Sequence, residues 1–347
     1  MSDKPLSLLF ITQKVSSEDP VLGFVHGWLL EFAKEMDVTV ICLERGPHRL
    51  PKNVRVFSLG KERGLKRFGY LRNFYRLIWE ERKRYGAVFV HMNPEYVLLG
   101  GLLWRLSLKK VMLWYNHEAG GVLLRIAAFF SNKVLHTSPY AYPARFGNAL
   151  TMPAGIDTKL FSLQTVPKVP RSILFLGRIS PIKHIELLIE AGKKLRERHI
   201  DCKLSIYGNA GQRDEGYRKE LVRLGRELTA EDRLVFRDGI PNYKAPQVYS
   251  AHEVFVNLSP SGLFDKTILE ALASETLVLV SSKAFTNVLP SEYLFREGDV
   301  EDLTEKMRSL LELSPQAKLE HGKQYRKYVE REHSLEELSG RLVKLYQ

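Results

Sequence analysis

The chain has 347 residues, enough for two globular domains, and its content of 44% hydrophobic and 27% charged residues excludes a disordered or fibrous protein. Two cysteines are too few for a disulfide scaffold or a cysteine-based zinc site, and no apolar run approaches the roughly 18 residues of a membrane span. Residues 1–150 carry +10 of the net charge of +12, which suggests an anionic partner. Because the chain enters an apolar strand directly, we expect a cytoplasmic protein.

Short apolar segments alternate with amphipathic helical stretches along both halves of the chain. The first half has predicted strands at Leu6–Ile11, Val38–Leu43, Val54–Ser58, Ala87–His91, Val111–Tyr115 and Val134–Thr137. The second half has them at Ile173–Leu176, Leu204–Tyr207, Leu234–Arg237, Val254–Leu258 and Leu277–Ser281. Several segments are apolar without alternation, as in parallel strands covered on both faces. The pattern predicts two domains, each with a doubly wound α/β fold.

Prolines and a loss of periodicity mark a boundary between the two halves. We expect an N-terminal Rossmann-like domain over 1–157, a linker over 158–171 and a C-terminal Rossmann-like domain over 172–333. A final helix over 334–347 is expected to pack back toward the N-terminal domain. In folds of this kind, ligands bind at the carboxyl ends of the strands.

The first motif that points to a ligand follows the predicted strand Ile173–Leu176. There Gly177 and Arg178 begin a turn that reaches Lys183 just before the next helix. A glycine at the end of a parallel strand lets the backbone turn sharply, and cations near a helix N-terminus can hold an anion. Spacing alone leaves phosphate binding and a solvated turn as equal alternatives.

A second motif lies between the predicted strand Val254–Leu258 and a helix, and reads Ser-Pro-Ser-Gly-Leu-Phe-Asp-Lys-Thr from Ser259. Backbone N–H groups at the start of that helix could hold an anion, and Glu270 lies further along it. Taken alone, the pattern slightly favours the simpler interpretation, a surface helix with solvated charges.

Together the two motifs resemble those of family 4 glycosyltransferases, which have the GT-B fold. The matching strings are Gly-Arg-x4-Lys at Gly177–Lys183 and Glu-Ala-Leu-Ala at Glu270–Ala273. Three connecting motifs occur in the family's order as well, at Pro153–Phe161, Tyr207–Asn209 and Phe236–Pro241. The resemblance covers nearly the whole chain and implies two Rossmann-like domains that face each other across a cleft.

The resemblance also implies a role for each matching residue. Arg178 and Lys183 would neutralise the donor diphosphate, and Glu270 would bind the ribose hydroxyls of the nucleotide. His117, which follows the predicted strand Val111–Tyr115, would lie beside the transferred sugar, although a histidine at a strand end is more often structural. The other implied donor-binding positions are Gly23, Gly177, Gly208, Asn209, Gly239 and Ile240.

The sequence departs from the family pattern at one position. Family members usually carry a Glu-x7-Glu pair whose first glutamate contacts the donor sugar, but here Gly262 stands eight residues before Glu270. The string resembles a subgroup with Gly-x-x-Asp-Lys before Leu-Glu-Ala. Asp265 and Lys266, with Thr267 beside them, are then the candidates for the sugar or phosphate contacts.

The chain contains no Asp-x-Asp, His-x-x-x-His or paired-cysteine spacing, so we expect no metal and no cofactor other than the donor, a UDP-sugar or GDP-sugar. Missing glycine-rich fingerprints also argue against dinucleotide dehydrogenases and P-loop enzymes. Basic side chains and helix N-termini would then replace a divalent ion at the diphosphate.

The basic excess is concentrated in Lys61–Arg84, with nine Lys or Arg, three Glu and interleaved aromatic residues. One interpretation is an amphipathic helix that packs on the N-terminal sheet with a cationic outer face. The other is a patch that binds anionic lipid at the inner face of the membrane. Because no nucleic-acid-binding fold accompanies the stretch, we do not expect a nucleic-acid partner.

The resemblance implies a retaining, metal-independent glycosyltransferase that acts on a saccharide or lipid-linked acceptor, as in polysaccharide or glycolipid synthesis. The departure at Gly262 leaves a nucleotide-sugar-binding protein with weakened catalysis as an alternative. A membrane-binding or polyanion-binding module is a further alternative, suggested by Lys61–Arg84.

Overall fold

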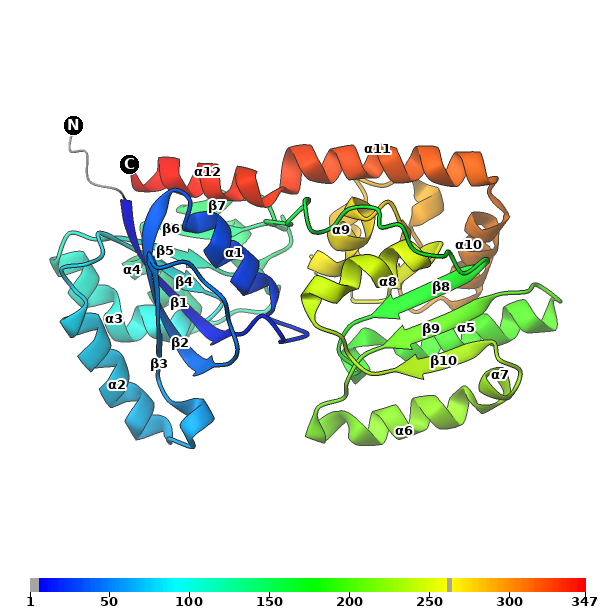
Figure 1. Ribbon diagram of the computed structural model, residues 1–347, viewed down its shortest axis with the longest axis horizontal. Coiled ribbons are helices and arrows are strands. Elements are labelled where there is room, and N and C mark those ends of the chain that lie inside the picture. Colours follow the sequence, from blue (N-terminus) through cyan, green and yellow to red (C-terminus); the bar gives the residue numbers. More distant parts are fainter. Residues whose placement is uncertain (1–5, 261–263) are drawn as a thin grey trace. The chain divides into compact units, whose positions relative to one another are not determined.

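The computed structural model describes residues 6–260 and 264–347, which form two compact units (Figure 1). The N-terminal unit contains residues up to Gly155 together with Leu335–Gln347, and the C-terminal unit is Ile156–Ser334. The final helix, α12 (Leu335–Tyr346), therefore belongs to the N-terminal unit, where the Tyr346 hydroxyl donates to Val88 O at 3.0 Å.

The N-terminal unit is built on a seven-stranded parallel sheet with the order β3-β2-β1-β4-β5-β6-β7. Its strands are β1 (Leu6–Val15), β2 (Met36–Arg45), β3 (Val54–Ser58), β4 (Ala87–His91), β5 (Lys110–Trp114), β6 (Lys133–His136) and β7 (Ala149–Thr151). Its other helices are α1 (Phe24–Phe32), α2 (Arg67–Glu80), α3 (Pro94–Leu106) and α4 (Val122–Phe130). The sequence pattern missed β7, because three residues are too few to show a period.

Alternate side chains of the central strand supply the two halves of this unit's core. Leu8 and Phe10 of β1 face one side of the sheet and pack with buried residues of α1 and α12. Leu9 and Ile11 face the other side and pack with α2, α3 and α4. Helices thus cover both faces of this sheet. This explains why the sequence of its strands is apolar without alternation.

The C-terminal unit has a five-stranded parallel sheet with the order β10-β9-β8-β11-β12. Its strands are β8 (Ser172–Leu176), β9 (Lys203–Tyr207), β10 (Leu234–Arg237), β11 (Val254–Asn257) and β12 (Leu277–Val280). Its helices are α5 (Ile185–Glu197), α6 (Glu215–Leu224), α7 (Arg226–Ala230), α8 (Ala245–Ala251), α9 (Lys266–Ala273), α10 (Val300–Glu312) and α11 (Pro315–His333). The predicted doubly wound α/β architecture is therefore confirmed in both units.

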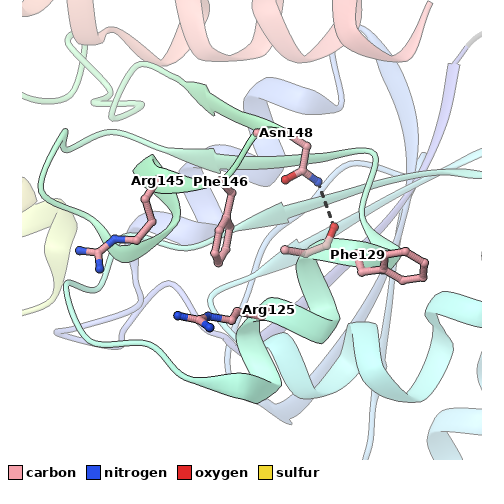
Figure 2. Close-up of a pocket in the computed structure, with 7 residues that line it drawn as sticks. Arg125, Phe129, Arg145, Phe146 and Asn148 are labelled. Atoms are coloured by element: carbon pink, nitrogen blue, oxygen red, sulfur yellow. Dashed lines mark hydrogen bonds between the residues drawn. The ribbon is translucent and has the colours of Figure 1, made fainter.

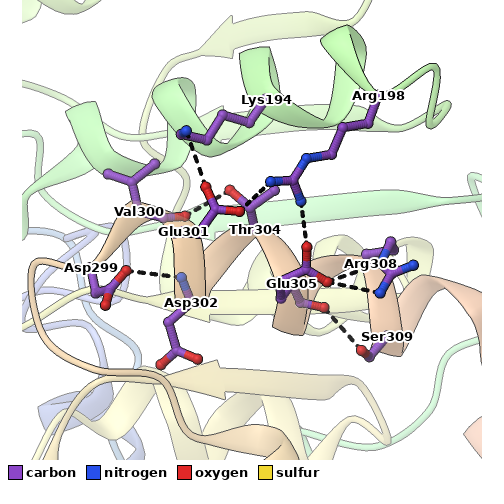
Figure 3. A network of polar contacts seen from close by, with 10 residues as sticks. All are labelled: Lys194, Arg198, Asp299, Val300, Glu301, Asp302, Thr304, Glu305, Arg308 and Ser309. Atoms are coloured by element: carbon purple, nitrogen blue, oxygen red, sulfur yellow. Dashed lines mark hydrogen bonds and ion pairs between the residues drawn. The ribbon is translucent and has the colours of Figure 1, made fainter.

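An ion-pair network joins α10 to the end of α5 on the surface of this unit (Figure 3). Arg198 pairs with Glu301 and Glu305, while Lys194 lies 3.1 Å from Glu301. These side chains are partly exposed, and exposed pairs contribute little to stability. We therefore attribute the packing of the two helices to their buried apolar faces rather than to this network.

The segment 158–171 contains no helix or strand and is counted with the C-terminal unit. Val169 N–H donates to Ala251 O at 2.8 Å, and Arg326 donates to Thr158 O at 3.0 Å, so both ends of the segment are held against that unit. In the described part of the chain, no helix combines the length and the apolar composition needed to cross a bilayer.

Candidate functional site

The order of strands in the C-terminal unit creates a switch point between β8 and β11. The chain winds from β8 through β9 to β10 on one side, and then returns to place β11 and β12 on the other side. Loops that leave the carboxyl ends of β8 and β11 therefore diverge, and ligands of open α/β sheets bind in the space between such loops. Both sequence motifs singled out above begin in these two loops.

Glycines line the carboxyl ends of β8, β9 and β10. A Cβ atom on Gly208 would lie 2.0 Å from Gly177 O, so only glycine permits this approach of two backbones. Asn209 then accepts a hydrogen bond from Gly239 N–H through Oδ1, at 2.9 Å. Ile240 follows and is half-buried. The structure thus brings these predicted positions together along one edge of the sheet.

Lys183 ends the short 3-10 helix η3 (Pro181–Lys183) and reaches across to the loop that follows β11. Its Nζ lies 2.9 Å from Ser259 Oγ and 2.5 Å from Asp265 Oδ2. The side chains of Lys183 and Asp265 are 21% and 19% exposed, so the pair is partly shielded from water yet still accessible. Two of the three N–H groups of the Lys183 ammonium are thus engaged, which leaves one for an incoming anion.

Asp265 has a second role at the start of α9. Its Oδ1 accepts a hydrogen bond from Thr267 N–H at 3.3 Å, which makes it the N-cap of this helix. Its Oδ2 also accepts from Asn257 Nδ2 at 3.2 Å. Burial opposes ionisation, but the charge of Lys183 and these hydrogen bonds outweigh it and hold the pKa of Asp265 well below its usual range. Both oxygens of the predicted sugar-binding carboxylate are therefore engaged within the protein.

Glu270 lies one turn into α9 and is buried. Its Oε1 accepts from Asn242 Nδ2 at 3.1 Å and its Oε2 from the Tyr249 hydroxyl at 3.4 Å. Burial raises the pKa of Glu270 to about 7, despite the opposing hydrogen bond from Asn242 and the charge of Lys266. Burial also lowers the pKa of Lys266 to about 7, against the attraction of Glu270. The surface-helix interpretation of this segment is therefore wrong, because α9 is buried from Ile268 to Ala273.

The remaining residues of the two motifs have less defined surroundings. Arg178 is exposed in the loop after β8 and forms no ion pair with an acidic side chain among the described residues. Thr267 lies in the first turn of α9, and its hydroxyl accepts from Asn257 Nδ2 at 3.3 Å. Gly262, where the sequence departs from the family pattern, lies outside the described residues.

Two predicted site residues belong to the N-terminal unit. His117 is exposed in the loop after β5, where its Nδ1 accepts from Ala119 N–H at 3.0 Å and its carbonyl accepts from Tyr142 N–H at 2.9 Å. Gly23 precedes the first residue of α1 and donates its N–H to Asp19 O at 3.0 Å. Both residues thus follow the carboxyl ends of strands in their own sheet.

Four residues of the C-terminal site were missed by sequence reasoning: Asn242, Tyr249, Asn257 and Ser259. Asn257 and Ser259 carried a usable indication, since polar residues at the end of an apolar parallel strand face the ligand edge of the sheet. No sequence signal marks Asn242 and Tyr249, because only the tertiary packing of η5 (Asn242–Lys244) and α8 brings them to Glu270.

Comparisons with known proteins point to the same unit. Residues 170–313 match the family described as Glycosyl transferases group 1. The sulfoquinovosyl transferase of Arabidopsis thaliana is 30% identical over 147 residues, which are 40% of this chain and 26% of that protein. The alpha-monoglucosyldiacylglycerol synthase of Streptococcus pneumoniae is 28% identical over 125 residues, 36% of this chain and 27% of that one. The matched stretch thus spans about a quarter of the length of these curated relatives.

Similarity to solved structures extends over both units. The structure of HepE from Anabaena in complex with UDP-glucose matches with a TM-score of 0.79 and 14% identity, and the match covers 98% of this chain and 99% of that one. At this level of identity the similarity shows the fold alone. The chain therefore has the GT-B fold, with two Rossmann-like sheets flanked by helices, as the sequence resemblance predicts.

Proposed function

We propose that the chain is a glycosyltransferase that moves a sugar from a UDP-sugar or GDP-sugar to a saccharide or lipid-linked acceptor. The observation that carries the proposal is the juxtaposition of Lys183 with the start of α9 at the switch point of the C-terminal sheet. A cation there lies where a diphosphate would reach it, and the buried Glu270 stands one turn further along the same helix. The match of residues 170–313 to a glycosyltransferase family supports the assignment.

Three charged side chains of this site have a task in the proposed reaction. Lys183, which Asp265 holds beside the start of α9, contacts the donor diphosphate and, with the exposed Arg178, stabilises the charge that develops on the departing nucleotide. Glu270 accepts hydrogen bonds from the ribose hydroxyls. The backbone at Gly208 and Gly239 frames the base, and no divalent ion takes part.

The acceptor is assigned to the N-terminal unit, and the anomeric configuration is retained. In this mechanism the acceptor hydroxyl attacks on the face that the diphosphate leaves, and its proton passes to a diphosphate oxygen. His117 orients the transferred sugar and stabilises positive charge at the anomeric carbon; this role rests on its place in the sequence motif. We further propose attachment at the inner face of the membrane through Lys61–Arg84.

A thermal-shift screen with UDP, GDP and their sugars, followed by a transfer assay, tests the proposal. Lys183→Ala should lower the transfer rate by roughly 10²–10³, as the loss of one oxyanion donor does elsewhere. Lys219→Ala removes an exposed lysine of α6 and should leave the rate unchanged. Equal rates for the two variants would overturn the assignment of the diphosphate site.

A nucleotide-sugar-binding protein without turnover is the second candidate, motivated by Gly262 where family members carry a glutamate. Such a protein would show thermal stabilisation by the donor, but it would release neither free sugar nor transferred product. The same assays therefore separate the two functions.

A further inference from the structure

Exposed apolar side chains are concentrated on three helices of the N-terminal unit. In the described part of the chain, twenty large hydrophobic side chains are exposed, and twelve of them lie between residues 68 and 129. Eleven of them lie on α2, α3 or α4, and Leu108 follows the end of α3. The twelve are Phe68, Leu71, Tyr75, Trp79, Leu102, Leu103, Leu106, Leu108, Val122, Leu123, Ile126 and Phe129. Such clustering is unusual for a surface that faces only water, and it marks an interaction site.

The exposed residues form stripes with helical spacing. On α2 the stripe runs through Phe68, Leu71, Tyr75 and Trp79, three or four residues apart, while Phe74 and its neighbours on the opposite face are buried. On α4 every residue except Arg125 is apolar. Leu124, Ala127 and Ala128 pack inward, and Phe129 is 78% exposed. A helix that is apolar on nearly all sides requires cover on both faces, and the described residues cover only one face of α4.

The three helices lie against one another, so their stripes belong to one surface. The Tyr75 hydroxyl of α2 donates to Leu99 O of α3 at 3.2 Å. A Cβ atom on Gly101 of α3 would lie 2.8 Å from Phe130 Cβ of α4, which shows how closely those helices approach. Figure 1 shows α2, α3 and α4 together beside the N-terminal sheet.

Basic side chains accompany this apolar surface. Residues 66–130 contain eleven Lys or Arg and four Glu, a net charge of +7. The Arg82 guanidinium lies over the Trp79 ring, 4.1 Å from its centre, so a cation and an exposed aromatic ring stand together. Apolar residues that insert and cations that surround them are the combination that binds an anionic bilayer surface.

A hollow of about 640 Å³ opens at the end of α4, between that helix and the 3-10 helix η2 (Tyr142–Arg145). Arg125 and Arg145 line it and extend in the same direction past Phe146 (Figure 2). Arg125 Nε donates to the Tyr142 hydroxyl at 3.0 Å, and Arg145 lies over the Tyr142 ring at 4.8 Å. Neither guanidinium pairs with an acidic side chain of the described residues, so both can bind an anion.

We propose that the exposed faces of α2, α3 and α4 dock on an anionic phospholipid bilayer, with a lipid phosphate held between Arg125 and Arg145. A second copy of the chain is the less suitable occupant, because the segment 66–130 has a net charge of +7 and would meet the same charge on the second copy. The inference rests on the membrane attachment proposed above for Lys61–Arg84, and it extends the contact to α3, α4 and the arginine pair.

The experiment measures co-sedimentation with phosphatidylcholine vesicles, with and without phosphatidylglycerol. The double variant Leu123→Ser, Phe129→Ser should weaken binding by roughly tenfold for each inserted side chain that is removed. Arg125→Gln with Arg145→Gln should weaken binding to the anionic vesicles by roughly fivefold for each charge, and binding to neutral vesicles hardly at all. Val222→Ser, an exposed apolar residue of α6, is the matched control and should bind as the unaltered protein does.

Three outcomes would overturn the inference. Unchanged binding of the α4 variant would restrict any membrane contact to α2 and leave the attachment through Lys61–Arg84 standing. If neither the unaltered protein nor the variants bind vesicles, both the docking surface proposed here and the attachment through Lys61–Arg84 are wrong. A dimer of the unaltered protein that the α4 variant dissociates, seen by equilibrium sedimentation, would identify the surface as a self-association face. Donor binding, measured without vesicles, tests the glycosyltransferase proposal separately.

Discussion

The Nζ of Lys183 lies 2.5 Å from Oδ2 of Asp265, a residue 82 positions further along the chain. The same carboxylate caps α9 through Thr267 N–H, so one side chain both starts a helix and holds a lysine at its N-terminus. A lysine placed there adds its charge to the positive end of the helix dipole. In the function proposed above, Asp265 thereby sets the position from which Lys183 would contact the diphosphate of the donor.

The two roles of Asp265 can be separated by substitution. Asp265→Asn should keep the helix cap, because asparagine is an equally good N-cap, but it loses the ion pair with Lys183. We expect transfer to fall roughly tenfold or more with little change in melting temperature. Asp265→Ala should also lose about 1 kcal/mol of stability with the cap. If the asparagine variant transfers sugar at the unaltered rate, Asp265 acts only as a cap.

The raised pKa of Glu270 predicts a loss of stability as the pH rises. Burial moves this pKa from 4.5 to about 7, so the folded protein holds a proton between these values that the unfolded chain has lost. The free energy of unfolding should therefore fall between pH 4.5 and pH 7, by up to about 3 kcal/mol from this group. In the Glu270→Gln variant, the free energy of unfolding should not show this decrease. Urea titrations at pH 4.5 and pH 7 would measure the difference. If the free energy of unfolding changed equally with pH in the variant and in the unaltered protein, the prediction would be wrong.

Gly208 is predicted to accept no side chain. Gly208→Ala would place Cβ 2.0 Å from Gly177 O, and the resulting backbone shift should lower the free energy of unfolding by about 1–3 kcal/mol. It should also weaken donor binding, because both glycines lie at the ligand edge of the sheet. Gly216→Ala in α6, where the added Cβ would meet no described atom within 4 Å apart from its own turn of helix, should leave stability unchanged or slightly higher. Urea denaturation of both variants checks the difference.

Chelation tests the proposal that no metal takes part. If Lys183, Arg178 and backbone N–H groups alone balance the charge of the diphosphate, transfer should continue in EDTA at nearly the same rate. Activity that disappears in EDTA and returns with Mg²⁺ or Mn²⁺ would show that a divalent ion supplies this charge instead.

Local patterns in the sequence predicted most of the fold. Apolar segments of four to six residues separated by amphipathic helices are a local property, and they predicted every strand except β7. Gly177 and Lys183 were singled out because a ligand edge follows the strands of a parallel sheet, and strand ends can be read from the sequence. Glu270 was assigned a role only through the resemblance to family 4 glycosyltransferases. The fold and the outline of the candidate site could therefore be predicted from the order of residues.

Only the tertiary structure decides which residues that lie far apart in the chain come into contact. Nothing in the sequence joins Lys183 to Asp265, or Glu270 to Asn242 and Tyr249, because such contacts depend on which strands become neighbours at the switch point. The sequence also did not indicate that one face of α4 is exposed, because an apolar helix resembles a core helix until its neighbours are known. Burial and pairing arise from packing between distant segments, and periodicity within one segment carries no information about them.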